Sequence, residues 1–197
     1  MPLSPEQIAG CWRQEYEKAP ATLARMSEIN TLAAAFNANV DSVVKISGAE
    51  LQRRIRQTGM TLAELKNDAD RSIRRPEDVL RGIFRCFTLG IAEEWIAQDK
   101  EIYRWMKKEL GTEKLQMGAQ AGIIANTMSL TGIGRVVTHV GALPELQARQ
   151  FFKRDNLLSF DQNGTLKPAH TVNRPNEEAS IHWIIEFDKD DRLDRKS

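Results

Sequence analysis

The chain has 197 residues, of which 41% are hydrophobic and 28% charged, and its formal net charge is +1. These values are ordinary for a soluble globular protein with one substantial core. A net charge this close to zero gives no overall field for recruiting nucleic acid, an anionic membrane or an acidic substrate. Any such binding would need a local patch.

The sequence predicts a cytoplasmic protein that makes no membrane contact, with a non-classically secreted protein as the alternative. The first residues contain neither a basic n-region nor an apolar h-region, so we expect no signal peptide. The least polar stretch, Gly118–Gly141, is interrupted by polar residues such as Asn126 and is too rich in glycine for a membrane span. Cys11 and Cys86 both lie in apolar helical patterns, where we expect them to be reduced and buried.

Helix-start signals and apolar spacing predict helices along the first part of the chain. Ser4 can cap a helix, and Gln7 can complete a capping box with it. A second helix is predicted over residues 20–36 from its apolar periodicity. Residues 37–39 then predict a break, and residues 40–46 a short helix.

Two stronger helix signals follow. Thr61 and Glu64 form a second capping box. The clearest helix begins at Pro76 and carries an apolar residue at every fourth position, namely Val79, Ile83, Phe87, Ile91 and Trp95. A further helix is predicted over residues 102–110, with Gly111 placed just beyond its C-terminus.

The pattern changes near residue 155. Residues 113–143 combine glycines with small apolar residues, which predicts closely packed, buried helices. A last helix is predicted from Pro144 to about Arg154. Residues 157–166 predict two strands joined by an Asn-Gly turn, and residues 180–187 predict a third strand with Trp183, Ile185 and Phe187 on its packed face.

The predicted fold is α+β and mainly α: one bundle-like domain of about eight helices with a small C-terminal antiparallel sheet. Residues 1–155 would form the helical body, and residues 156–190 a β element packed on it. The charged residues 191–197 would form a frayed tail.

Residues 32–48 resemble the helix-turn-helix of repressor-type DNA-binding proteins. The resemblance implies a first helix before Asn37 and a recognition helix from Val40. Basic residues that could contact phosphates lie in and after this segment; they include Lys45, Arg53, Arg54, Arg56, Arg74 and Arg75. A solvated basic helical hairpin is the alternative interpretation.

Arg135 and His139 would share one face if their segment is helical, because they lie four residues apart. The pair resembles, with fewer intervening positions, the Arg and His pair of the helical HEPN ribonucleases. That resemblance implies a nuclease or hydrolase in which His139 is the acid or base and Arg135 stabilises negative charge. A pair that merely packs a helix is the alternative.

A metal site is one hypothesis for the C-terminal region. If the chain closes a hairpin between His170 and His182, the two imidazoles face each other, and Glu186 lies on the same side as His182. Two surface or half-buried histidines are the alternative, because a slip of one residue in the strand register separates the ligands. The segment Thr131–Val137 has two glycines of a phosphate-binding loop but lacks the third glycine and a Walker lysine. No cofactor is predicted.

No catalytic motif of high specificity is present, so the leading functional interpretation is a non-enzymatic binding or regulatory protein. It would act through its helical faces or an exposed strand edge, with a protein as partner. A DNA-binding regulator and a hydrolase or nuclease are the two alternatives, with nucleic acid as the alternative partner. The sequence does not indicate an oligomeric state.

Overall fold

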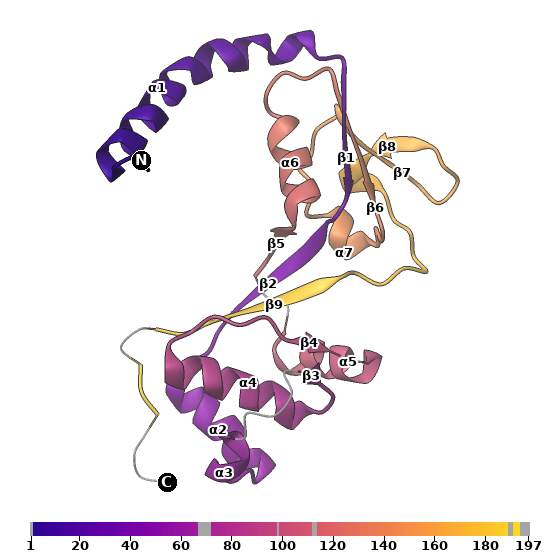
Figure 1. Ribbon diagram of the computed structural model, residues 1–197. Coiled ribbons are helices and arrows are strands. Elements are labelled where there is room, and N and C mark those ends of the chain that lie inside the picture. Colours follow the sequence, from indigo (N-terminus) through magenta and orange to yellow (C-terminus); the bar gives the residue numbers. More distant parts are fainter. Residues whose placement is uncertain (1, 67–71, 98, 112–113, 189–190, 194–197) are drawn as a thin grey trace. The chain divides into compact units, whose positions relative to one another are not determined.

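The computed structural model describes residues 2–66, 72–97, 99–111, 114–188 and 191–193 (Figure 1). The chain forms two compact units, each built from two separate stretches of sequence. Unit 1 comprises Met1–Val40 and Gln116–His182, and unit 2 comprises Asp41–Leu115 and Trp183–Ser197. This division differs from the expected one into residues 1–155 and 156–190. Among the described residues, no helix is long and apolar enough to cross a membrane.

Three strands carry the chain from one unit to the other. They are β2 (Asn39–Lys45), β5 (Leu115–Gly118) and β9 (Ile181–Glu186), and they form a sheet in the order β5-β2-β9. In the sequence, the first stretch of unit 2 therefore lies between the two stretches of unit 1. Strand β9 then leads from unit 1 into the second stretch of unit 2. The predicted third strand is confirmed by β9, but it lies beside β2 and does not extend the sheet that contains the predicted hairpin.

Unit 1 is built around a four-stranded sheet in the order β1-β6-β7-β8. Its elements are α1 (Pro5–Ala24), the 3-10 helix η1 (Arg25–Glu28), β1 (Thr31–Phe36), α6 (Gln120–Met128), β6 (Arg135–Val140), α7 (Glu145–Ala148), β7 (Leu157–Phe160), β8 (Leu166–Pro168) and the 3-10 helix η2 (Ala169–Thr171). Strands β1, β6 and β7 are parallel, whereas β8 is antiparallel to β7. The hairpin predicted from the Asn-Gly turn is confirmed by β7 and β8.

The core of unit 1 lies on one face of this sheet. Val136, Thr138 and Val140 alternate as the buried residues of β6, which is the period-2 pattern of a strand with one covered face. Helix α6 packs against β1 and β6 (Figure 1). It contributes Ala125 to a cluster that also contains Leu157, and small residues let the helix approach the sheet closely.

Unit 2 is mainly helical. It contains α2 (Gly48–Thr58), α3 (Leu62–Leu65), β3 (Ser72–Ile73), α4 (Pro76–Leu89), β4 (Ile96–Ala97) and α5 (Lys100–Glu109), together with most of β2 and β9. Its core is formed by one face of each of α2, α4 and α5, which contribute Leu51, Leu80 and Met106 to one hydrophobic cluster. Trp183 and Ile185 of β9 pack against this cluster, as the alternation of that strand predicted.

Several predicted helix ends are confirmed. The capping box of Ser4 with Gln7 begins α1, and that of Thr61 with Glu64 begins α3. Helix α4 begins at Pro76, but it ends at Leu89 because Gly90 adopts a left-handed conformation, with φ of 64°. Ile91 and Trp95 of the predicted apolar stripe therefore lie beyond the end of α4. Neither cysteine forms a disulfide, but Cys11 is exposed where burial was expected.

The predicted fold class is wrong, because the described residues form two mixed α/β units in place of one helical bundle. Residues 31–36 form β1 although three of them are alanine, a strong helix former. Their partner β6 is rich in the β-branched residues that favour strands, and this pairing overrides the local propensity of alanine. Residues 39–45 are likewise a strand, so the segment 32–48 is not a helix-turn-helix.

The glycine-rich segment before β6 is also not helical. Gly134 donates its N–H to the carbonyl of Ile29 at 3.1 Å. A side chain at this position would bring its Cβ to 3.0 Å from the carbonyl oxygen of Asn30. Glycine therefore allows the start of β6 to lie directly against the segment that leads into β1, which is a different reason for glycine from the helix packing that was predicted.

Candidate active site at the carboxyl ends of the unit 1 strands

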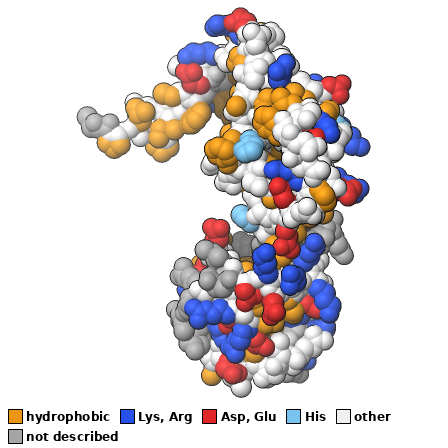
Figure 2. All heavy atoms as spheres, turned by 90° about the vertical axis from the view of Figure 1, so that its right-hand side faces the viewer, with side chains coloured by type: hydrophobic (Ala, Val, Ile, Leu, Met, Phe, Trp, Pro, Cys, Tyr) orange, Lys and Arg blue, Asp and Glu red, His pale blue; other side chains and the backbone are white. Residues whose placement is uncertain are grey.

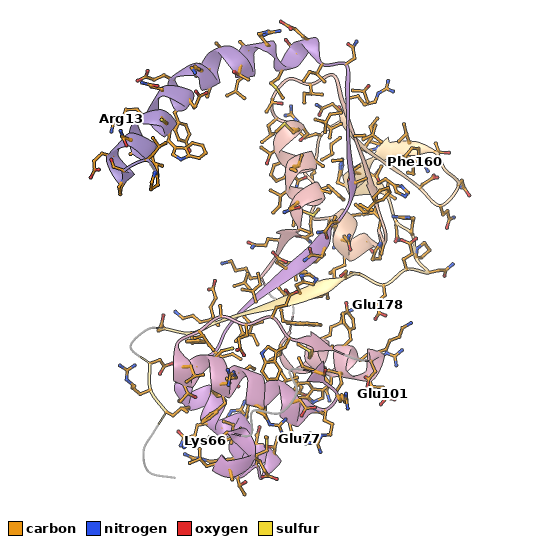
Figure 3. The ribbon with its side chains drawn as sticks, viewed as in Figure 1. Arg13, Lys66, Glu77, Glu101, Phe160 and Glu178 are labelled. Carbon is orange, nitrogen blue, oxygen red and sulfur yellow. The ribbon has the colours of Figure 1, made fainter. Side chains whose placement is uncertain are left out.

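The parallel strands of unit 1 end together at one edge of the sheet. Phe36 pairs with Val140 at the ends of β1 and β6, and β7 runs parallel to them and ends at Phe160 (Figure 3). In open α/β sheets, ligands bind in the crevice beyond the carboxyl ends of the strands. The segments that leave β1 and β6 at this edge are therefore the candidate ligand-binding segments.

The segment after β1 is held by main-chain contacts. The carbonyl of Asn37 accepts a hydrogen bond from the N–H of Ala121 at 3.0 Å, and the carbonyl of Ala38 accepts one from Nε2 of Gln147 at 3.0 Å. The side chain of Gln147 is fully buried, and its Oε1 has no hydrogen-bond partner among the described residues. The side chain of Asn37 is exposed at the same edge. The edge thus combines an accessible carboxamide with a rigid backbone.

The start of α6 has a strained backbone. Ala119 has φ of 57° and ψ of 161°, a region occupied almost only by glycine, and no side chain caps the helix that follows. Gly122 in the first turn of α6 lies so close to Met117 that a side chain there would overlap its thioether. It also faces Ala38, with 3.2 Å between an added Cβ and the methyl group. The packing therefore fixes the strained helix start against the segment that leaves β1.

Such a helix start suits an anionic or polar ligand. The N–H groups of the first helical turn carry partial positive charge and attract phosphate or hydroxyl oxygens. Strain of this kind is typical of functional sites, because the surrounding packing must maintain it. Asn37, Ala119 and the first turn of α6 are therefore the candidate binding elements.

A partly buried ion pair holds the segment that leaves β6. Arg174 donates from Nη2 to the carbonyl of Val140 at 2.9 Å, and its Nε lies 3.1 Å from Oε2 of Glu177. That carboxylate accepts the N–H of Leu143 at 2.6 Å. The two charges therefore compensate each other, and each group also bonds to the backbone. The pair holds the end of β6 in place, and the candidate ligand contacts remain Asn37 and the start of α6.

The structure places Arg135 and His139 on a strand, where they were expected on a helix. Both are exposed on the same face of β6, but four residues of strand separate their Cα atoms by about 13 Å, not by one helical turn. His139 lies between two aromatic rings at the carboxyl edge, with centroid distances of 5.6 Å to Phe36 and 6.0 Å to Phe160. Arg135 lies at the opposite end of the strand, so the two do not form a joint acid and cation site.

The histidines proposed as metal ligands lie on different elements. His170 is in η2, whereas His182 and Glu186 are exposed on β9. Strand β8, which precedes His170, pairs with β7 and not with β9, so the hairpin assumed for the metal site is not formed. Within the described ranges, no group of three His, Cys, Asp or Glu side chains could hold a metal ion.

The basic residues proposed for DNA binding lie in unit 2, and most of them are paired with carboxylates. Lys45 lies 3.0 Å from Asp188, and Arg53 and Arg54 both contact Glu50 at 2.7 Å. The hydrogen bond from Arg53 lowers the pKa of Glu50 to about 2. These pairs neutralise much of the local excess of positive charge.

Two of the remaining predicted phosphate contacts, Arg74 and Arg75, lie at the start of α4. Arg74 and Arg75 both donate their backbone N–H to Asp78, at 3.1 and 3.0 Å. Burial raises the pKa of Asp78, but these hydrogen bonds and the one from Arg81 outweigh it and hold the pKa below its usual value. Arg56 is exposed on α2. The backbone of Arg74 and Arg75 therefore stabilises the start of α4 through Asp78.

The site residues Asn37, Ala119, Gly122 and Gln147 were missed by sequence reasoning. Asn37 was interpreted as a break between helices because β1 was not recognised. A run of small apolar residues followed directly by Asn is the signal that could have identified a strand end. The strained conformation of Ala119 has no sequence signal, since alanine is an ordinary residue for a helix.

Unit 1 is an α/β unit whose mainly parallel sheet has a polar carboxyl edge and an uncapped helix start beside it, the arrangement at which α/β proteins commonly bind polar or phosphorylated ligands. The chain belongs to the family described as the ADP-specific phosphofructokinase/glucokinase conserved region, whose family model matches residues 30–197. This membership overturns the non-enzymatic interpretation, and the DNA-binding and hydrolase or nuclease alternatives are wrong as well, because the family is one of sugar kinases.

The chain is similar to kinases of known activity. It is 32% identical over 158 residues to the ADP-specific phosphofructokinase of Pyrococcus abyssi, covering 79% of this chain and 35% of that protein. It is 30% identical over 179 residues to the ADP-dependent glucose/glucosamine kinase of the same organism, covering 89% and 38%. The chain therefore spans about a third of the length of these relatives.

Solved structures of the family share its fold. The last common ancestor of ADP-dependent phosphofructokinases from Methanosarcinales matches with a TM-score of 0.69 and 26% identity, covering 90% of this chain and 38% of that one. A phosphofructokinase from Pyrococcus horikoshii, solved with AMP, matches with a TM-score of 0.68 and 28% identity, covering 81% and 36%.

Proposed function

We propose that this chain carries the part of an ADP-dependent sugar kinase that binds the acceptor sugar. The family match over residues 30–197 carries the proposal, and the named relatives act on glucose, glucosamine or a phosphofructokinase substrate. The ligand class is accordingly a hexose or hexose phosphate. A cytoplasmic location remains part of the proposal.

The reaction would transfer the terminal phosphoryl group of ADP to a sugar hydroxyl. A new bond forms between phosphorus and the sugar oxygen, the bond between the two ADP phosphates breaks, and the hydroxyl proton is released. The products are a sugar phosphate and AMP. Such transfers depend mainly on positioning and on stabilising negative charge, because the phosphoryl group itself is reactive once aligned.

Unit 1 offers suitable contacts for the acceptor. The exposed carboxamide of Asn37 can both donate to and accept from sugar hydroxyls. The N–H groups at the start of α6 can donate to a hydroxyl or phosphate oxygen. The backbone bond from Ala121 to Asn37 holds these two elements together at 3.0 Å, so a ligand would meet a preformed arrangement.

Calorimetric titration of the purified chain with D-glucose, D-glucosamine and fructose 6-phosphate tests the proposal, with L-glucose as the stereochemical control. We expect saturable binding of at least one D-sugar and none of L-glucose. Asn37→Ala should weaken binding about tenfold or more, because a site built to pair with hydroxyls loses a partner. Asn163→Ala, in the exposed turn between β7 and β8, is the matched control and should bind normally.

Turnover is measured on the same sample by following AMP formation from ADP, with ATP as the comparison donor. AMP formation that requires both ADP and the bound sugar would support kinase activity in this chain. Binding of none of the D-sugars, or an affinity unchanged by Asn37→Ala, would overturn the assignment of the acceptor site to this edge.

A further inference from the structure

Helix α1 exposes a hydrophobic stripe. It spans 20 residues and has no buried residue, and the capping box at Ser4 gives it a defined start. Ile8, Trp12, Tyr16 and Leu23 follow one another at intervals of four, four and seven residues, so they lie on one helical face. Trp12 is 63% exposed and Tyr16 74%. Figure 2 shows hydrophobic side chains exposed along this helix.

A second hydrophobic surface lies on α6. The inner side of that helix, with Ala121 and Ala125, is buried against unit 1. Ile123 and Ile124 on its outer side, and Leu130 in the turn that follows it, are each about half exposed, at 50%, 45% and 57%. Clustered exposed aliphatic side chains of this kind mark an interaction surface.

We propose that α1 of one copy docks on the α6 surface of a second copy, so that two copies exchange their first helices. Among the described residues, η1 is the one element against which α1 packs extensively, so the stripe is not covered by its own unit. One chain supplies both surfaces. An exchange of identical elements between two copies therefore closes as a two-fold dimer without further contacts.

The expected contact area is sufficient for a stable dimer. An aromatic side chain buries about 150–250 Å² when it is fully covered. Trp12 and Tyr16 are 63% and 74% exposed, so with the two half-exposed aliphatic residues the stripe offers roughly 450 Å². The three half-exposed aliphatic residues of the α6 surface offer roughly 300 Å². Because the exchange makes this contact twice, the total of about 1,500 Å² falls within the range of about 1,200–2,000 Å² for standard interfaces.

The proposal is independent of the kinase assignment. The family model begins at residue 30, after α1 has ended, so this helix is outside the matched region. The side chains of the α1 stripe lie outside the candidate acceptor site, whereas Ile123 of the α6 surface lies in the first turn of α6, beside that site. A protein that fails to bind sugar could still be a dimer, and a monomer could still bind sugar.

Light scattering combined with size exclusion, over about a hundredfold range of concentration, measures the mass of the full chain. We expect a dimer. Trp12→Glu and Ile123→Glu should each weaken association about thirtyfold or more, as expected for a central aromatic or aliphatic contact that is replaced by a charge. Arg13→Glu, an exposed substitution on α1 outside the stripe (Figure 3), is the matched control and should leave the dimer intact.

Circular dichroism checks that these variants remain folded, which we expect because all three side chains are exposed. A wild-type protein that is monomeric over the whole range would overturn the proposal. So would a dimer that both Trp12→Glu and Ile123→Glu leave unchanged.

Cross-linking identifies which surface the helix contacts. Cys11 is exposed beside the stripe, so a short bismaleimide can join it to a cysteine introduced by Ile124→Cys, in a background that carries Cys86→Ala. The exchange predicts a covalent dimer on a denaturing gel, and none from the same background with Leu62→Cys on exposed α3. A cross-link confined to single chains would show that α1 folds back on its own α6, and would overturn the exchange.

Discussion

Replacing Ala119 by glycine should stabilise unit 1. Alanine at φ 57° and ψ 161° carries strain of about 1–3 kcal/mol, which glycine lacks. Glycine also makes the unfolded chain more flexible, which costs roughly 0.5–1 kcal/mol. The difference predicts a gain of about 1 kcal/mol in the free energy of unfolding, or about 2–4 °C in Tm for a chain of 197 residues.

The matched control is Ala121→Gly, two residues further along. Ala121 lies in α6 with ordinary helical geometry and is 5% exposed, so glycine there should destabilise by about 1 kcal/mol. Urea denaturation gives both free energies, and hydrogen exchange of the α6 amides reports the opening of unit 1 itself. If Ala119→Gly lowers stability as Ala121→Gly does, the strain at residue 119 is refuted.

Three further substitutions test the ion pairs and the core. Asp78→Asn should cost about 2–4 kcal/mol, because three N–H groups would lose their carboxylate, whereas Glu77→Gln beside it should change little; urea denaturation measures both. The pKa of Glu50 is lowered from 4.5 to about 2, so the folded state binds its proton less readily than the unfolded state, and the stabilisation is lost as pH falls through that window. Glu50→Gln should therefore flatten the decline in stability between these pH values, and an unchanged acid limb would count against the pairing. Leu157→Ala should cost about 2–5 kcal/mol because its side chain is fully buried, whereas exposed Leu62→Ala should cost less than about 1 kcal/mol; equal effects on thermal unfolding would contradict the core assignment.

The sequence predicted best where the signal is local. A helix start depends on a side chain that reaches a backbone N–H three residues away, so Ser4 and Thr61 could be identified without knowledge of the fold. The β7–β8 hairpin is equally local, because a short turn sets its register. These elements are present as predicted, and each depends on residues close together in the chain.

The sequence predicted poorly where structure depends on distant partners. Strand β1 pairs with β6 about a hundred residues later, and neither strand has the alternating polarity of a half-exposed hairpin. The helical period seen over residues 20–36 therefore had no competing local signal. The missed strands also explain the missed site, since Asn37 acquires its position only as the first residue beyond a strand end.

No sequence motif revealed the site, because its elements are assembled by backbone contacts. The candidate binding elements come from the end of β1 and the start of α6, which are joined by the backbone hydrogen bond from the N–H of Ala121 to the carbonyl of Asn37. A carbonyl and an N–H carry no side-chain signature, so such a contact is compatible with many sequences. Strain at Ala119 is similarly invisible in composition and appears only in the backbone angles. A binding edge that is assembled from backbone contacts can thus be recognised only after the fold is known, because its residue types alone do not identify it.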